Sequence, residues 1–233
     1  RGVDVAEHVI ERDAWVAAQT RQLPPREERA MLIARAPDTL PQGNALYDNA
    51  RPRFETSLGP NYQQTLGGPD SFLLFQIGAV GNAKLRLRDD TWLQGTVQVG
   101  LYDNYDKFKV TGPSNLPRVR TYLREYVTTS QMTIPNLQAT HVGRLSDNQY
   151  YSVYAGYLEP YFGGIGTEWL YRPFASRVAL GVDANLVKQR SFEQDLSFDN
   201  AGDQTGYRVA TGHATLYWDT GWNGVQANLS VGR

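Results

Sequence analysis

Four stretches of the chain alternate apolar and polar residues, and this period-two pattern constrains the fold more than any other feature. The stretches are residues 92–101, 178–186, 210–218 and 225–232, about nine or ten residues each. A strand that crosses a bilayer at a tilt needs about 9–11 residues, whereas strands in soluble domains usually have about 5–6. The pattern therefore predicts a mainly β fold and favours long antiparallel strands of the kind that build a membrane β-barrel.

Each of these stretches has one aliphatic or small side and one side of Gln, Thr, Asn, Asp and Gly. In a membrane barrel the apolar side meets lipid and the polar side meets a wet interior. In a soluble sandwich the same apolar side packs between two sheets. The mean hydropathy of −0.48 suits both arrangements. Aromatic residues near predicted strand ends resemble an interfacial girdle: Tyr102, Trp169, Tyr171, Trp218 and Trp222.

The texture of the chain changes near residue 70. Residues 1–35 are expected to form a helical, periplasmic segment, with one helix over 4–20 and a second over 26–35. Asp4 and Glu7 have the spacing of a capping box at the start of the first helix. Residues 36–70, rich in Pro, Gly, Asn and Asp, are expected to be an extended linker. Residues 71–233 are expected to supply antiparallel strands of an incomplete barrel.

The predicted connections alternate in length. Asp89-Asp90 and residues 220–223 read as tight turns, whereas residues 103–120 and 189–206 are long and polar. Short periplasmic turns and long external loops are typical of outer-membrane barrels. The alternation therefore agrees with the barrel interpretation.

Composition and spacing argue against several kinds of function. The 23 Lys+Arg and 24 Asp+Glu give no basic excess for nucleic acid, and the absence of cysteine removes thiolate metal sites. His8, His141 and His213 lack metal-ligand spacing, and no Gly-x-Ser-x-Gly elbow occurs. We expect neither catalysis nor a metal or cofactor. The carboxylates considered for a glycosidase pair are read as solvated groups: Glu159, Glu168, Asp183, Glu193 and Asp195.

Polar-face residues are the candidates for lining a lumen or contacting a polymer. Lys84, Arg86 and Arg88 form a basic ladder that would attract an anionic polymer, unless acidic residues of neighbouring strands pair with it. Arg118, Arg120 and Arg124 follow in a Pro-rich segment. The full candidate set is Lys84, Arg86, Arg88, Trp92, Gln94, Gln98, Asp183, Asn185, His213 and Tyr217. A separate aromatic run could stack on sugars or belong to the girdle: Tyr150, Tyr151, Tyr154, Tyr157, Tyr161 and Phe162.

Several long strings in the chain resemble the YjbH-type exopolysaccharide biosynthesis proteins, to which the capsule protein GfcD is similar. The strings are LGPNYQQTLGGPD at 58–70, LYDNYDKF at 101–108, PSNLPRVRT at 113–121, LSDNQYYSVYAGYLEP at 145–160 and GHATLYWDTGWNG at 212–224. The resemblance implies an outer-membrane β-barrel lipoprotein of Gram-negative bacteria. Members of this family are longer and begin with a lipid-modified cysteine, so this chain is expected to be an internal fragment.

The resemblance also implies a role in export or surface assembly of an exopolysaccharide or capsule, as a passive conduit. The expected partners are outer-membrane lipid, an anionic or neutral exopolysaccharide, and other proteins of the secretion system. Two alternatives remain open at this point. One is a soluble β-rich carbohydrate-binding module, and the other is a polysaccharide-modifying hydrolase.

Overall fold

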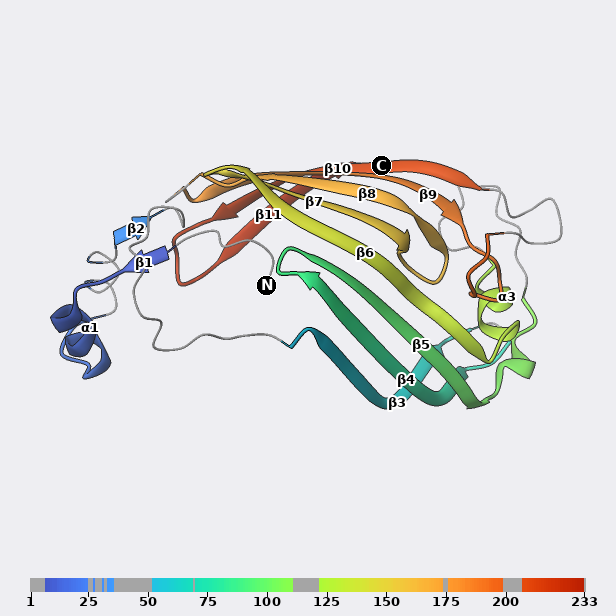
Figure 1. Ribbon diagram of the computed structural model, residues 1–233. Helices are drawn as coiled ribbons and strands as arrows, with labels where there is room; N and C mark the ends of the chain where they lie inside the picture. Colours follow the sequence, from blue (N-terminus) through green and yellow to red (C-terminus); the bar gives the residue numbers. More distant parts are fainter. Residues whose placement is uncertain are drawn as a thin grey trace. The chain divides into compact units, whose positions relative to one another are not determined.

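The computed structural model describes residues 7–24, 27, 31, 33–35, 52–68, 70–110, 122–173, 176–198 and 207–232 (Figure 1). The chain forms two compact units, residues 1–51 and 52–233. Among the described residues, no helix has the length and apolar character needed to cross a membrane.

The described part of the first unit includes a small antiparallel ladder and helix α1, and Glu27 and Met31 are also helical. Strand β1 (Glu7–Val9) pairs with β2 (Ile33–Arg35), and α1 spans Arg12–Gln19. The predicted helices over 4–20 and 26–35 are therefore wrong at these two strands, because pairing between distant segments overrides the local helical spacing. Since Glu7 lies in a strand, it cannot complete the predicted capping box, and Asp4 lies outside the described residues.

The second unit is one nine-stranded antiparallel sheet in which every strand pairs with its neighbours in sequence, in the order β11 to β3 (Figure 1). The predicted mainly antiparallel β class is confirmed. Strands β3 and β11 form the two edges, so the described sheet is not closed into a barrel. The strands are β3 (Phe54–Leu66), β4 (Leu73–Arg88), β5 (Thr91–Asp103), β6 (Met132–Ser146), β7 (Gln149–Tyr157), β8 (Phe162–Tyr171), β9 (Val178–Gln189), β10 (Arg208–Asp219) and β11 (Gln226–Gly232).

Strand β3 occupies part of the segment that was expected to be a linker, so that prediction is wrong for Phe54–Leu66. The edge position explains how β3 tolerates Pro60, because proline in a sheet is confined largely to edges. The Arg86 amide donates to the Arg53 carbonyl (2.8 Å). Backbone bonding alternates along an antiparallel pair, and the register between β3 and β4 is unbroken. The backbone of Pro60 therefore faces the open edge.

The connections alternate between the two ends of the sheet, and the predicted alternation in length holds for the two long connections but not for residues 158–161. Residues 89–90, 147–148, 172–177 and 220–225 turn at one end, and residues 67–72, 104–131, 158–161 and 190–207 connect strands at the other. Both long connections therefore leave from the same end. The first of them contains η2 (Tyr105–Lys107) and helix α3 (Leu123–Thr128).

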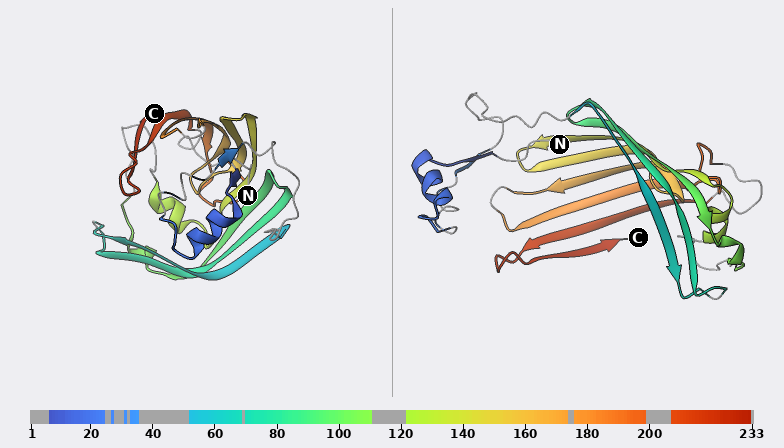
Figure 2. Two further views of the ribbon diagram at one scale, coloured as in Figure 1. Left: turned by 90° about the vertical axis from the view of Figure 1, so that its left-hand side faces the viewer. Right: turned by 90° about the horizontal axis from the view of Figure 1, so that it is seen from below.

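One face of the curved sheet is apolar and uncovered in the described part of the chain. Cross-strand rows such as Leu180–Leu216–Leu229 lie on this face. Figure 2 shows α3 within the curl of the sheet, and α3 lies against the polar face, so the apolar face is the convex one. Its exposed aliphatic side chains are Leu58, Leu93, Val97, Val153, Ile165, Leu180, Val182, Leu186, Leu216, Leu229 and Val231.

A glycine in β7 supplies the first stability prediction. Gly156 has φ +135°, and a Cβ there would collide with the Leu137 carbonyl of β6. We expect Gly156→Ala to destabilise the sheet by about 1–3 kcal/mol from backbone strain alone, measured by urea unfolding in detergent micelles. Gly59→Ala is the matched control, because no heavy atom lies within 4 Å of its Cβ position. Equal unfolding midpoints for the two variants would refute the prediction.

Candidate functional site

The polar, concave face of the sheet carries most of the predicted site residues. Pairing places Lys84 opposite Gln94 and Arg86 opposite Trp92 on β4 and β5. On the same face but nearer the β11 edge, Asp183 of β9 lies opposite His213 of β10. The structure thus divides the candidates between two groups rather than gathering them in one cluster.

The first group breaks up the predicted basic ladder. The Arg86 Nη2 donates to Glu55 Oε1 of β3 at 2.9 Å, and the Arg86 side chain is buried. The Lys84 Nζ lies 4.5 Å from the ring centroid of Trp92, a cation–π geometry. Arg88 is exposed and follows a register shift in the pairing with β5. The ladder is therefore not a uniform strip of positive charge. Arg86 is paired with an acidic residue of a neighbouring strand, which was the alternative to attracting an anionic polymer.

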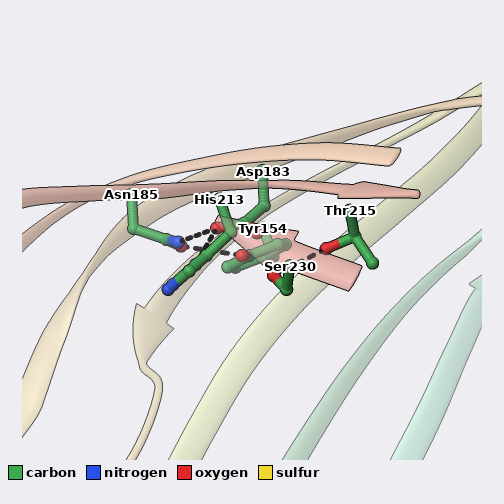
Figure 3. Close-up of polar contacts among 6 residues, drawn as sticks. All are labelled: Tyr154, Asp183, Asn185, His213, Thr215 and Ser230. Atoms are coloured by element: carbon green, nitrogen blue, oxygen red, sulfur yellow. Dashed lines mark hydrogen bonds and ion pairs between the residues drawn. The ribbon is translucent and has the colours of Figure 1, made fainter. Parts of the chain in front are cut away.

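The second group is a hydrogen-bonded chain across β7, β9 and β10 (Figure 3). The Tyr154 hydroxyl donates to Asn185 Oδ1 (2.7 Å), and Asn185 Nδ2 donates to Asp183 Oδ2 (3.1 Å). The same Asp183 oxygen lies 3.3 Å from His213 Nδ1. The chain presents a phenol, an amide, a carboxylate and an imidazole on one side of the sheet. Such a surface offers both donors and acceptors to a hydroxylated ligand.

A glycine makes this chain possible. Tyr154 and Asn185 belong to strands that are separated by β8, where Gly166 pairs with both residues. A Cβ at Gly166 would collide with the Asn185 Oδ1 and with the Tyr154 ring. The missing side chain therefore lets the tyrosine reach across β8. The sequence analysis did not assign this role to Tyr154 or Gly166, and only the strand register reveals it.

The three remaining candidates, Gln94, Gln98 and Tyr217, also lie on the polar face. The Trp92 indole donates to Gln94 Oε1 at 3.1 Å. Gln98 belongs to a glutamine ladder nearer the end with the long connections. Tyr217 is exposed and packs over Gly181, whose Cβ position is 3.1 Å from the tyrosine ring.

The aromatic run from Tyr150 to Phe162 does not act as one surface. Strand alternation puts Tyr154 on the polar face and Tyr151 on the apolar face, where Tyr151 pairs with Trp169. Phe162 is buried. The run is therefore divided between the two faces of the sheet.

Aromatic side chains gather at both ends of the apolar face. Near the short turns, Trp169 stacks on Tyr171 with ring centroids 6.2 Å apart. Near the long connections, Phe75 lies 6.4 Å from Tyr62 and 5.9 Å from Tyr102. Tyr and Trp are enriched at membrane–water interfaces. The two groups lie toward opposite ends of the strands.

Helix α3 and residues 190–198, together called the end cap, cover one end of the polar face. The Tyr126 hydroxyl donates to the Arg190 carbonyl (2.6 Å), and Gln194 Nε2 donates to the Tyr126 carbonyl (2.6 Å). Burial raises the pKa of Tyr126 to about 12, so the phenol stays protonated. Hydrogen bonds from Ser197 and Ser191 hold the pKa of Asp195 below its usual value despite some desolvation. The end cap is therefore tied together by internal polar contacts.

The basic segment Arg118, Arg120 and Arg124 is only partly described. The Arg124 Nε donates to the Phe108 carbonyl at 2.7 Å, whereas Arg118 and Arg120 lie outside the described residues. Among the described residues, no group of three His, Cys, Asp or Glu side chains could hold a metal ion. His141 lies on the apolar face, where its ring nitrogens contact the Thr91 and Tyr151 hydroxyls.

Comparison with known proteins finds one matching family and one similar relative. The family described as exopolysaccharide biosynthesis protein YbjH matches residues 1–233. The uncharacterized lipoprotein YjbH of Escherichia coli K12 is 43% identical over 185 residues, which are 78% of this chain and 26% of the relative. The matched region thus spans about a quarter of the relative's length. No solved structure matches the chain.

Proposed function

The chain belongs to the YjbH family of exopolysaccharide biosynthesis proteins, and from this premise we propose that its sheet is part of the wall of an outer-membrane β-barrel. In this proposal the barrel exports an exopolysaccharide or displays it at the cell surface. The polymer moves passively along the polar face, without catalysis or a cofactor. Residues 1–35 lie in the periplasm, where they and other parts of the longer protein meet further components of the secretion route.

The observation that carries the proposal is the uncovered apolar face. Its aliphatic side chains, such as Leu186 at 59% and Leu229 at 66% exposure, would be costly to leave in water over so wide an area. In a bilayer the same face would contact acyl chains, with the aromatic bands at the two interfaces.

Strand length and edge structure support the same proposal. Every strand from β3 to β10 has at least nine residues, as a tilted crossing requires. The open edges at β3 and β11 must be paired inside a bilayer, because unsatisfied backbone groups there cost several kcal/mol each. Further strands of a longer protein would supply that pairing.

The polar face supports a role in handling a polysaccharide. Its residues include amides, hydroxyls and aromatic rings, with the charged groups partly paired, as in the contact of Arg86 with Glu55. Many weak hydrogen-bonding positions let a hydroxylated polymer bind at each point and also leave it. The relative's name as a lipoprotein agrees with attachment to the cell envelope.

Cysteine labelling tests the wall directly, because this chain has no cysteine of its own. We expect Thr215→Cys on the polar face to react with a hydrophilic maleimide in isolated outer membranes. Val182→Cys on the apolar face should react at least tenfold more slowly, since lipid excludes the reagent. Both variants should label fully in denaturant, which serves as the control. Equal labelling rates in membranes would contradict the proposed wall.

A further inference from the structure

A small cavity lies between the end cap and the polar face. Its volume is about 170 Å³, and it is bounded by α3, by Gln194 and by the polar face of β3 to β6. Figure 2 shows α3 on the inner side of the curled sheet. The volume is below the roughly 300–1,000 Å³ of sites for drug-sized ligands. The cavity therefore suits a single small unit rather than a long oligomer segment.

Three glutamines from three adjacent strands form the floor of the cavity. Gln63 Nε2 donates to Gln98 Oε1 at 3.3 Å, and Gln98 Nε2 donates to Gln76 Oε1 at 3.2 Å. The Gln76 side chain is 7% exposed. A Cβ at Gly100 would collide with the Gln76 amide, so the absence of a side chain at Gly100 leaves room for this amide. The ladder is thus a built feature with fixed amide orientations.

The opposite wall is aromatic and is held by the end cap. The Tyr126 and Tyr161 rings lie 4.4 Å apart in a tilted arrangement, and both residues line the cavity. Gln194, 7% exposed, also lines it and is oriented by its bond to the Tyr126 carbonyl. Glutamine amides and tyrosine residues therefore line the same small cavity.

The cavity has no charged side chain among its described lining residues. A second cavity on the polar face, of about 360 Å³, is lined by Glu55 and Lys84 among others. An acidic sugar unit in the end-cap cavity would lose hydration of its carboxylate without gaining a cationic partner. The lining therefore selects against uronates and other charged units.

We propose that this cavity is a binding subsite for one uncharged sugar unit of the polymer. The inference rests on the proposed function and specifies its substrate class. Each amide offers a donor and an acceptor in one plane, which matches two adjacent hydroxyls of a pyranose ring. The Tyr161 ring, packed on the buried Tyr126, supplies an apolar surface with a polar edge for the C–H face of the sugar. Glutamine and tyrosine together recognise the unit without charge.

Isothermal titration of the detergent-solubilised protein tests the subsite. The probes are neutral hexasaccharides of glucose, galactose or mannose, and a galacturonate hexasaccharide. We expect at least one neutral probe to bind, and the galacturonate probe to bind at least tenfold more weakly. Gln98→Met should weaken neutral binding about tenfold, and Gly100→Ala should do the same by displacing the Gln76 amide. Gln138→Met, on the polar face of β6 but outside this cavity, should bind like the unmodified protein.

The outcomes separate this inference from the proposed wall. Equal or tighter binding of galacturonate, no binding of any neutral probe, or an equal loss in Gln138→Met would each overturn the subsite. Unchanged urea midpoints confirm that the variants fold. The labelling contrast between Thr215→Cys and Val182→Cys reports the wall whether or not sugar binds. A protein that shows this contrast but fails the titration retains the wall and loses only the subsite.

Discussion

Val153→Arg is expected to lower the free energy of unfolding in lipid vesicles by about 2–4 kcal/mol, the cost of a cation near the bilayer midplane. Val153 lies at the centre of β7 on the apolar face and is 43% exposed. If this face met water and not lipid, the substitution would change stability by about 0.5 kcal/mol or less. The two environments therefore predict clearly different results.

Ser152→Arg is the matched control for this substitution. Ser152 is the preceding residue of β7 and projects to the polar face, where its hydroxyl donates to Glu168 Oε2 at 3.0 Å. An arginine there gains a carboxylate partner across the strand pair, so stability should change little. The measurement is the urea midpoint of refolding into vesicles, read from heat-dependent gel mobility. If both arginine variants refold equally well, the apolar face does not contact lipid.

Arg190→Met is expected to destabilise the end cap by about 4 kcal/mol. The Arg190 guanidinium is fully buried and donates to the carbonyls of Ile134, Pro135, Glu159 and Asp195. Its carbon Cζ also lies 4.6 Å from the Tyr157 ring centroid. Hydrogen bonds from a charged group contribute about 1.5–3 kcal/mol each, and they do not add fully when they are lost together.

Two variants test whether the fork of the guanidinium matters. Arg190→Lys keeps the charge but not the planar donor pair, so it should recover less than half of the lost stability. Arg88→Met removes an exposed arginine of β4 and should have little effect. Limited proteolysis within residues 190–198, with urea unfolding alongside, provides the readout. Wild-type protection in Arg190→Met would show that the carbonyl contacts do not hold the end cap.

The alternation of side chains predicted β5, β9, β10 and β11 and their two faces, but it did not single out β6, β7 or β8. The hairpin of β4 and β5 turns at Asp89-Asp90 as expected, and β9 and β10 cover the predicted runs. These segments could be predicted because each face of these strands keeps one character, apolar or polar, over many residues. Period-two patterning then specifies the strand and its orientation together.

Strand β3 and the first unit show where sequence reasoning failed. Gly59 and Pro60 signal a break in most contexts, and only the edge position, a property of the assembled sheet, makes them compatible with a strand. The strand pairing of residues 7–9 with residues 33–35 likewise depends on distant partners that local spacing cannot show.

The candidate site was predicted at the level of single residues but not of contacts. Asp183, Asn185 and His213 follow from alternation, because it places them on the polar side. Their connection to Tyr154 across Gly166 depends on the register of three strands. The end cap was outside the reach of periodicity altogether, because its contacts come from loop residues such as Arg190.

The orientation of Pro60 limits how the protein can grow at the β3 edge. A strand arriving there meets outward-facing amide donors at alternate positions, with one donor missing at Pro60. One carbonyl of the added strand then lacks an amide donor opposite Pro60. A bulge or a bound water molecule must accommodate that carbonyl. A single proline thereby favours some registers of an added strand over others. It also disfavours pairing of unrelated chains with the exposed β3 edge.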